Sequence, residues 1–177
     1  MISLIHNASF ENYKLLIDSL GICFYLGQTL MTHGHLLPQG LAEAYSAATG
    51  IEVSGKDLLE TAERSNQIER AINSLQGLDR RQDSFTRRPE KDSWAQGIDL
   101  DRPGMLDEYY ECRGLSKRGL PTLQRLLDAK LDDLASDLQK NRLVDSYTDS
   151  DHYRALNQII KNPSILEIGR GLKAKKN

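Results

Sequence analysis

The residues from Ser54 to Gly77 constrain the fold of this chain more than any other segment. Their apolar and small side chains recur at the period of an α-helix with one buried face. This stripe consists of Leu58, Ala62, Ser65, Ile68, Ile72 and Leu75. Ser54 and Asp57 have the spacing of a capping box, and Gly77 is a typical helix end. A long amphipathic helix is therefore predicted, which has to bury its stripe against other parts of the chain.

Helical patterns occupy most of the remaining chain. They cover residues 10–20, 38–50, 103–113, 121–138 and 149–162. Glycine or proline stands at several of their boundaries, as is usual where helices begin or end. No segment longer than about four residues keeps the alternation of a strand. We predict an all-α fold, an irregular helical domain with long ordered loops and an added C-terminal helical segment.

Two further segments lack a sustained period. Residues 77–104 contain several turn formers and are predicted to form a long ordered loop, which in a compact domain is usually functional or interfacial. Residues 169–177 form a short basic tail. Within 121–138, the last leucines are spaced by four, three and four residues, which suits packing against a partner helix.

Composition excludes several classes of protein. The 177 residues carry a net charge of −2, with 39% hydrophobic and 27% charged residues, so neither nucleic acid nor membrane is an expected partner. No apolar run has the length of a membrane span, and the N-terminus lacks the features of a secretory signal. We expect a cytoplasmic protein. Two cysteines, Cys23 and Cys112, are too few for a disulfide framework or for a complete metal site of about four ligands.

The stretch IDSLGIC, residues 17–23, places an acid, a glycine and a thiol close together after the first predicted helix. We predict that Asp18 to Cys23 forms a turn at the end of this helix, with Gly21 near its cap. By itself such a turn is compatible with an ordinary helix end and a buried cysteine. It is also compatible with half of a cofactor site. A thiolate at the C-terminus of a helix receives no help from the helix dipole, so it would need a metal to remain deprotonated.

Three other patterns have an ordinary and a functional interpretation. His33 and His35, with His6 and Cys23, could bind zinc, but a histidine pair in a loop is common and the ligand set is incomplete. Basic and aromatic residues mix in the long loop as they do in nucleic-acid sites, but neighbouring acids cancel most of the charge, which favours a solvated or interfacial loop. These residues are Arg80, Arg81, Phe85, Arg87, Arg88 and Trp94. Tyr109 and Tyr110 cannot share a helix face, so one is expected in the core and the other near the surface.

Three blocks of the sequence, taken together, resemble a known family. They are LLIDSLGICFY, TGIEVSGKDLLETAERSNQIERAINSLQGLDRRQDSF and MLDEYYECRGLSKRGLPT. Their order and spacing are similar to the C-terminal domain of the tungsten-dependent aldehyde ferredoxin oxidoreductase family, over roughly residues 10–127. The resemblance divides the chain into a family-like helical domain, residues 1–127, and a helical extension with a basic tail, residues 128–177.

The resemblance implies a cofactor site at residues 18–23. Members of the family hold a metal between two pterin dithiolenes beside a 4Fe-4S cluster, and their motif here is Asp-x-x-Gly-Leu-Cys. Asp18, Gly21 and Cys23 match it, with Ile22 in place of the leucine. The family resemblance implies that Asp18 bonds the amino group of one pterin and that Cys23 is a cluster ligand. The implied reaction oxidises an aldehyde to a carboxylate and passes electrons to ferredoxin.

The chain differs from the family because several of the family's cofactor-binding motifs have no counterpart in it. The other cluster cysteines, the first pterin motif and the N-terminal β domain of the family have no counterpart in these residues. We therefore expect the isolated chain to bind neither cofactor and to be inactive unless separately encoded upstream domains complete it; no catalytic residue is assigned to it. The alternative is a non-catalytic helical interaction domain or a gene remnant. Separation from the other domains should expose an apolar face, which either a homodimer that uses the leucine stripe or the helices after Leu127, folded back over it, would cover; we expect the homodimer.

Overall fold

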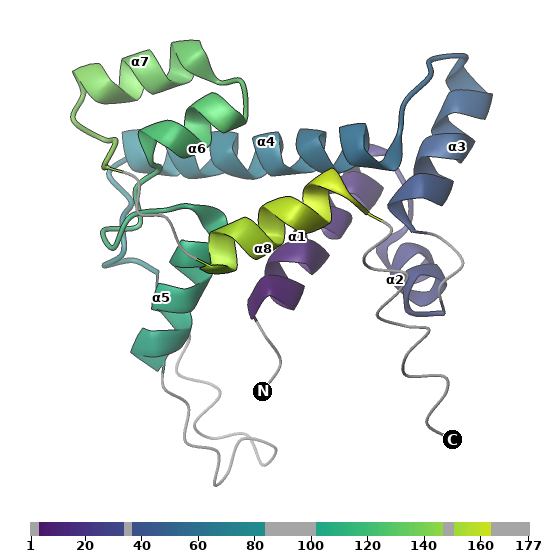
Figure 1. The fold of residues 1–177 in the computed structure, drawn as a ribbon, viewed down its shortest axis with the longest axis horizontal. Coiled ribbons are helices and arrows are strands. Elements are labelled where there is room, and N and C mark those ends of the chain that lie inside the picture. Colours follow the sequence, from purple (N-terminus) through teal and green to yellow (C-terminus); the bar gives the residue numbers. More distant parts are fainter. Residues whose placement is uncertain (1–3, 34–36, 84–101, 147–150, 164–177) are drawn as a thin grey trace, which may run out of the picture.

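The computed structural model describes residues 4–33, 37–83, 102–146 and 151–163 (Figure 1). These residues form eight helices and, apart from two isolated β-bridges, no β-structure, which confirms the all-α prediction. The helices are α1 (Leu4–Ser19), α2 (Phe24–Thr32), α3 (Pro38–Thr49), α4 (Gly55–Leu75), α5 (Arg102–Arg113), α6 (Leu123–Asp128), α7 (Asp132–Lys140) and α8 (Asp151–Lys161). Most of the predicted long loop lies outside the described residues, and so does the whole basic tail. Among the described helices, none is long and apolar enough to cross a membrane.

Helix α4 is the centre of the fold. Figure 1 shows α1 and α8 crossing it, with α3 at one end and α6 and α7 at the other. A first apolar core joins α1, α3, α4, α5 and α8 and includes Ile17, Leu41, Leu59 and Leu156. A second, smaller core lies between α4, α6 and α7 and consists of Ala71, Leu126, Ala135 and Leu138. The two cores therefore meet α4 at different points along its length.

The predicted boundaries of α3 and α4 are confirmed. The Ser54 backbone N–H donates to the Asp57 carboxylate at 2.8 Å, and the Asp57 N–H donates to the Ser54 hydroxyl at 3.2 Å, which completes the capping box. Gly50 ends α3 with a φ of 73°, in the left-handed conformation that glycine adopts most easily.

The buried face of α4 differs from the predicted stripe. Ile72 and Leu75 are 46% and 49% exposed, whereas Glu63 and Gln67 are buried. The prediction was wrong for the second half of the helix because it assigned apolar and small side chains to the buried face and left out the large polar ones. Charged partners on other helices bring the polar face of α4 into the interior.

The predicted helix over residues 121–138 is interrupted. It forms α6 and α7, which are separated at Lys130, a residue with a left-handed φ of 58°. The Lys130 N–H donates to the Leu127 carbonyl at 2.9 Å and the Leu131 N–H donates to the Leu126 carbonyl at 2.9 Å, the two bonds of a Schellman motif. The leucine spacing therefore does not describe one long helix.

This interruption also changes the interpretation of the leucines. Leu138 is fully buried, and Leu123, Leu131 and Leu134 pack on the same small core inside the chain. In addition, α8 lies against α1, α4 and α5, so residues after 127 cover the helices before it. The homodimer was argued from one long helix over residues 121–138, and these residues form two short helices instead. The homodimer itself stays a prediction, which light scattering on the full chain would test.

Glycine in place of Lys130 is expected to stabilise the protein. A left-handed φ costs an ordinary residue roughly 1–2 kcal/mol and costs glycine almost nothing, although glycine also gives the unfolded chain more freedom. The Lys130→Gly variant should therefore unfold with a free energy higher by about 0.5–1 kcal/mol in a denaturant titration. Lys140→Gly, at the exposed last residue of α7, is the control and should lower stability. Equal losses in both variants would contradict the strain at Lys130.

Candidate functional site

The turn between α1 and α2 has the geometry that the sequence predicts. The Gly21 N–H donates to the Asp18 carbonyl at 3.1 Å, and the Ile22 N–H donates to the Ile17 carbonyl at 2.8 Å. These bonds form a Schellman motif, and Gly21 supplies its left-handed residue with a φ of 71°. The predicted turn at the end of the first helix is confirmed.

The apolar residues of this turn determine which side chains face outward. Ile17 is 1% exposed, and Ile22 packs against the same apolar core. Asp18, Gly21 and Cys23 are exposed. The turn thus presents its carboxylate, its glycine backbone and its thiol to the surroundings, while its two isoleucines fix it to the domain.

Cys23 is also the N-cap residue of α2. We expected the Cys23 thiol at the C-terminus of one helix, where the helix dipole does not stabilise a thiolate. That expectation was incomplete, because a second helix starts directly after Cys23. The positive end of α2 favours an anionic group beside Cys23. Gly27 lets α2 approach α1 closely, since an added Cβ would lie 2.9 Å from Ile17 Cδ1, and the Tyr13 hydroxyl donates to the Gly27 carbonyl at 3.2 Å.

Asp18 forms an ion pair with Lys14 one turn earlier in α1. Both side chains are more than two-fifths exposed, so this pair is open to solvent and contributes little to stability. A ligand that offers N–H donors could replace Lys14 as the partner of Asp18. The carboxylate is therefore available for hydrogen bonding.

Other thiol and imidazole groups do not join this turn in the described residues. Cys112 is fully buried in α5, and burial, followed by nearby Glu108, raises the pKa of its thiol to about 12. His33 is exposed, and its Nδ1 lies 2.8 Å from the Thr29 carbonyl. No group of three potential metal ligands occurs in the described part of the chain. His35 and the side chain of His6 lie outside it.

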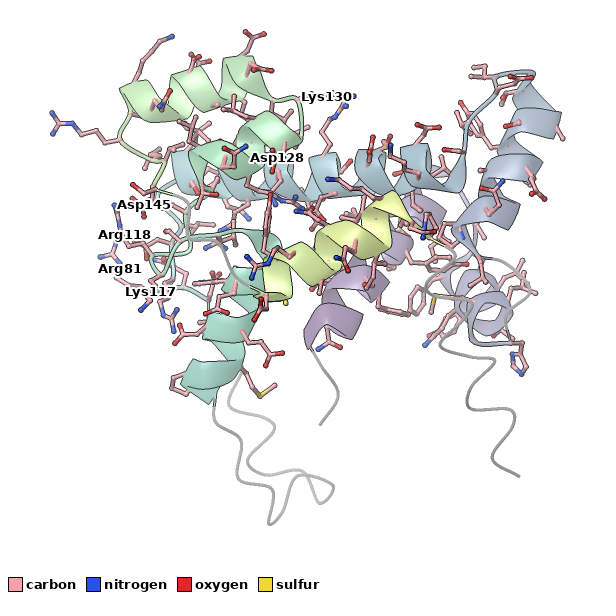
Figure 2. The ribbon with its side chains drawn as sticks, viewed as in Figure 1. Arg81, Lys117, Arg118, Asp128, Lys130 and Asp145 are labelled. Atoms are coloured by element: carbon pink, nitrogen blue, oxygen red, sulfur yellow. The ribbon has the colours of Figure 1, made fainter. Side chains whose placement is uncertain are left out.

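In the described part of the basic loop, two arginines form ion pairs with acids. Arg80 contacts Asp107 at 2.6 Å, and Arg81, which is labelled in Figure 2, contacts Asp79 at 2.9 Å. Phe85, Arg87, Arg88 and Trp94 lie outside the described residues. The prediction for the tyrosine pair is confirmed, because Tyr110 is 2% exposed and Tyr109 is only partly buried.

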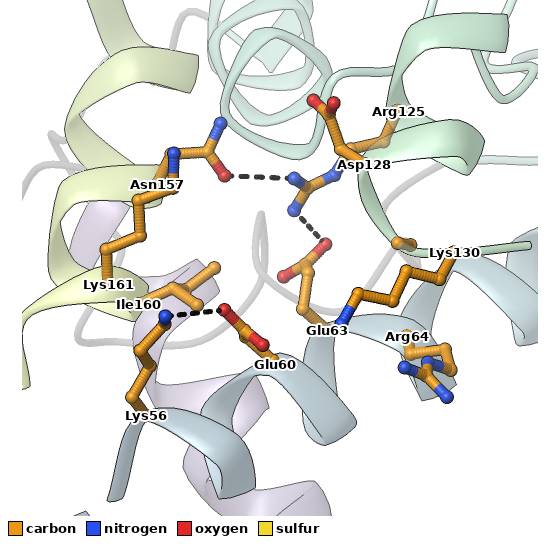
Figure 3. Close-up of a pocket in the computed structure, with 11 residues that line it drawn as sticks. Lys56, Glu60, Glu63, Arg64, Arg125, Asp128, Lys130, Asn157, Ile160 and Lys161 are labelled. Atoms are coloured by element: carbon orange, nitrogen blue, oxygen red, sulfur yellow. Dashed lines mark hydrogen bonds and ion pairs between the residues drawn. The ribbon is translucent and has the colours of Figure 1, made fainter.

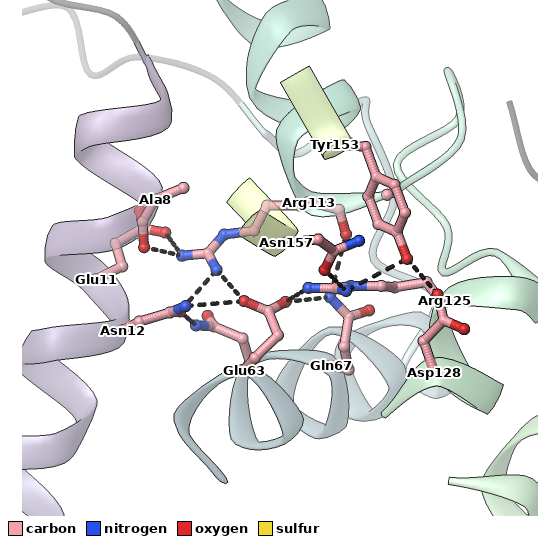
Figure 4. Close-up of polar contacts among 12 residues, drawn as sticks. Ala8, Glu11, Asn12, Glu63, Gln67, Arg113, Arg125, Asp128, Tyr153 and Asn157 are labelled. Carbon is pink, nitrogen blue, oxygen red and sulfur yellow. Dashed lines mark hydrogen bonds and ion pairs between the residues drawn. The ribbon is translucent and has the colours of Figure 1, made fainter. Parts of the chain in front are cut away.

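The largest polar feature of the interior was missed in the sequence. It is the Glu63 cluster, which we define as Asn12, Glu63, Gln67, Arg113 and Arg125 (Figure 4). One carboxylate oxygen of Glu63 accepts from Arg113 Nη1 at 2.8 Å and from Asn12 Nδ2 at 3.0 Å. The other lies 2.5 Å from Arg125 Nη2 and accepts from Gln67 Nε2 at 3.0 Å. One oxygen therefore accepts two hydrogen bonds, and the other accepts one and forms an ion pair with Arg125.

The charge of Glu63 is held by these donors. Burial by itself would raise the pKa of this carboxyl, but Arg125 and Arg113 outweigh it and lower the pKa to about 2. The same carboxylate raises the pKa of both arginines despite their burial. The cluster is thus a fully ionised group of three charges in the interior.

The Glu63 cluster connects distant parts of the chain. Arg113 also donates to the Ala8 carbonyl at 3.0 Å and pairs with Glu11 of α1. Arg125 donates to Asn157 of α8 at 3.0 Å and lies 5.0 Å from the centre of the Tyr153 ring. The cluster therefore joins α1, α4, α5, α6 and α8, at a point on α4 between the two apolar cores.

Comparison with known proteins identifies a family for this chain. The family model described as "Aldehyde ferredoxin oxidoreductase, domains 2 & 3" matches residues 6–131, which is more than half of the chain. The match includes the turn from Asp18 to Cys23 and the Glu63 cluster, and it ends before α8. Comparison with curated proteins and with solved structures gave no match. The chain belongs to the aldehyde ferredoxin oxidoreductase family.

Proposed function

We propose that the turn from Asp18 to Cys23 forms one side of the tungstopterin and 4Fe-4S site of an aldehyde oxidoreductase. The observation that carries this proposal is the joint exposure of the Asp18 carboxylate and the Cys23 thiol on one turn. Structural cysteines are usually buried, as Cys112 is. The exposed position of Cys23 suits a ligand that lies outside the described domain.

The residues of the turn fit both cofactors chemically. The Asp18 carboxylate would accept hydrogen bonds from the amino edge of a pterin, and charge-assisted bonds of this kind are strong. Gly21 presents no side chain, so a bulky ring could lie close to the backbone. Cys23 would bind cluster iron, with the N-terminus of α2 favouring the negative charge of the site. When bound, these cofactors supply the two-electron oxidation of an aldehyde to a carboxylate and deliver the electrons to ferredoxin.

The site requires further residues from outside this sequence. A four-iron cluster needs about four protein ligands, and the chain contains two cysteines, one of them buried. The 177 residues would then be inactive alone, and the catalytic residues would lie on the domains that complete the site. Tyr25 and Leu26, directly after Cys23 in α2, are 77% and 55% exposed. We propose that such domains cover this surface. We also propose that the complex is cytoplasmic.

Replacing each cysteine separately tests the proposal. The chain is co-expressed with a polypeptide that carries the missing cluster cysteines and pterin motif, and the purified complex is analysed for iron, tungsten and visible absorption. Cys23→Ser should remove most of the iron because it deletes a cluster ligand. Cys112→Ser is the matched control, and it should keep the iron because this thiol is inside the first core.

The result also decides between the two functions. Equal iron content in both variants would contradict the role of Cys23. A complex that never contains iron or tungsten would leave the alternative, a non-catalytic helical interaction domain, as the better account.

A further inference from the structure

A pocket of about 280 Å³ lies between α4, α6 and α8, on a different part of the chain from the turn at Cys23 (Figure 3). Its size is just below the usual range of small-molecule sites, about 300–1,000 Å³. Ile160 and Ala129 give it some apolar wall, and most other lining side chains are charged. Ile160 and Lys161 belong to α8, which lies outside the residues matched by the family.

The acidic side chains of the pocket already have partners. Glu63 is held inside the Glu63 cluster, as described above. Glu60 pairs with Lys56 at 3.6 Å, one turn earlier in α4. Asp128 accepts a hydrogen bond from the Tyr153 hydroxyl at 2.6 Å. Each acid of the pocket therefore has a partner in the protein itself, and Asp128 keeps its negative charge because its tyrosine partner is neutral.

Some of the cations that line the pocket have no carboxylate partner. Arg64, Lys130 and Lys161 line it, and in the described residues none of them lies within 4.0 Å of a carboxylate oxygen; Lys130 acts on Asp57 only from a greater distance, where it helps to lower the pKa of that carboxyl. Arg125 is 3% exposed, and Figure 3 shows its guanidinium directed toward the middle of the pocket. Its Nε and the Nε of Arg64 are buried without a hydrogen-bond acceptor among the described residues. Buried donors of this kind are costly unless an acceptor is supplied.

We propose that this pocket binds the phosphoryl group of a small phosphomonoester. A phosphate dianion offers several acceptor oxygens, which suit the N–H groups of arginine and lysine. It would supply acceptors to the unpaired Nε atoms and balance the charge of Arg64, Lys130 and Lys161. The volume of the pocket exceeds that of a phosphate, and Ile160 offers an apolar surface to the organic part of the ester.

Calorimetric titration of the full chain with inorganic phosphate at constant ionic strength tests this site. The wild type should bind saturably, with a Kd of about 1 mM or below. Lys130→Gln should weaken binding about fivefold to tenfold because it removes one of the unpaired cations. Lys117→Gln is the matched control: Lys117 is also an exposed lysine, but it lies in the turn after α5, away from Lys130 (Figure 2).

The two lysine variants separate a built site from general attraction to a basic surface. Normal binding by Lys117→Gln together with weakened binding by Lys130→Gln supports the proposal. Equal weakening in both variants, or a wild type that shows no saturation, overturns it. Both substitutions are at exposed positions, so circular dichroism should show intact folding in each variant.

Discussion

Glutamine in place of Glu63 is expected to lower the free energy of unfolding by about 3–5 kcal/mol. The Glu63 side chain is 5% exposed and contacts two arginines that are each 3% exposed. An amide has the same shape but no charge, and one of its two ends donates hydrogen bonds where the arginines also donate. Arg113 and Arg125 would therefore remain buried as cations with too few acceptors. Urea unfolding followed by circular dichroism measures the loss.

The matched control is Glu60→Gln, one turn earlier on the same helix. Glu60 also pairs with a cation, Lys56, but both side chains are more than a third exposed. Exposed pairs of this kind contribute about 0–1 kcal/mol, so this variant should remain close to the wild type. If the two variants unfold at the same urea concentration, the Glu63 cluster does not hold the helices together.

Acid is expected to remove the same stabilisation from the wild type. The pKa of Glu63 is about 2 in the folded protein, against an ordinary value of 4.5. As pH falls, the unfolded chain takes up the proton first, so the contribution is complete above about pH 5 and is lost as pH falls toward 2. The shift corresponds to about 3 kcal/mol. Stability measured between pH 6 and pH 2 should therefore decrease, in part because of this residue.

Comparison with Glu63→Gln isolates that part. The hydrogen-bonded carboxylates of Asp57, Asp79 and Asp83 also have lowered pKa values, but they are present in both proteins. The difference in unfolding free energy between wild type and variant should thus decrease as pH falls through the acid range. A difference that stays constant from pH 6 to pH 2 would show that Glu63 titrates normally in the folded protein.

The features that could be predicted from the sequence are those determined locally. Ser54 and Asp57 satisfy backbone groups within one helical turn, and Gly21 and Gly50 provide left-handed residues at helix ends. Such signals depend only on neighbouring residues, so spacing is enough to recognise them. The position of the candidate turn and the left-handed conformation of its glycine follow from the same local rule.

Features that depend on distant partners could not be predicted in this way. Glu63 is four residues from Gln67, but its arginines are 50 and 62 positions further along the chain. Nothing in the helical period distinguishes a buried carboxylate from a solvated one. The break at Lys130 escaped prediction for a related reason, because a lysine in the left-handed conformation gives no signal of a helix end.

The position of Cys23 as the N-cap residue of α2 was also not predicted from the sequence. Cysteine is not a preferred N-cap residue, and α2 has no side-chain cap. The helix is held instead by the close contact of Gly27 with Ile17. A cap signal was therefore absent although a helix begins there.

The contacts of Arg125 with α8 have an evolutionary consequence. Arg125 lies inside the residues matched by the family, whereas two of its partners, Tyr153 and Asn157, lie outside them. A lineage that lost α8 would expose a buried guanidinium that keeps Glu63 but lacks its partners Tyr153 and Asn157, and selection would then favour a different residue at position 125. The arginine and the C-terminal helix are therefore expected to have been acquired together and to be lost together. Related chains that carry one without the other would need a new acceptor for this cation.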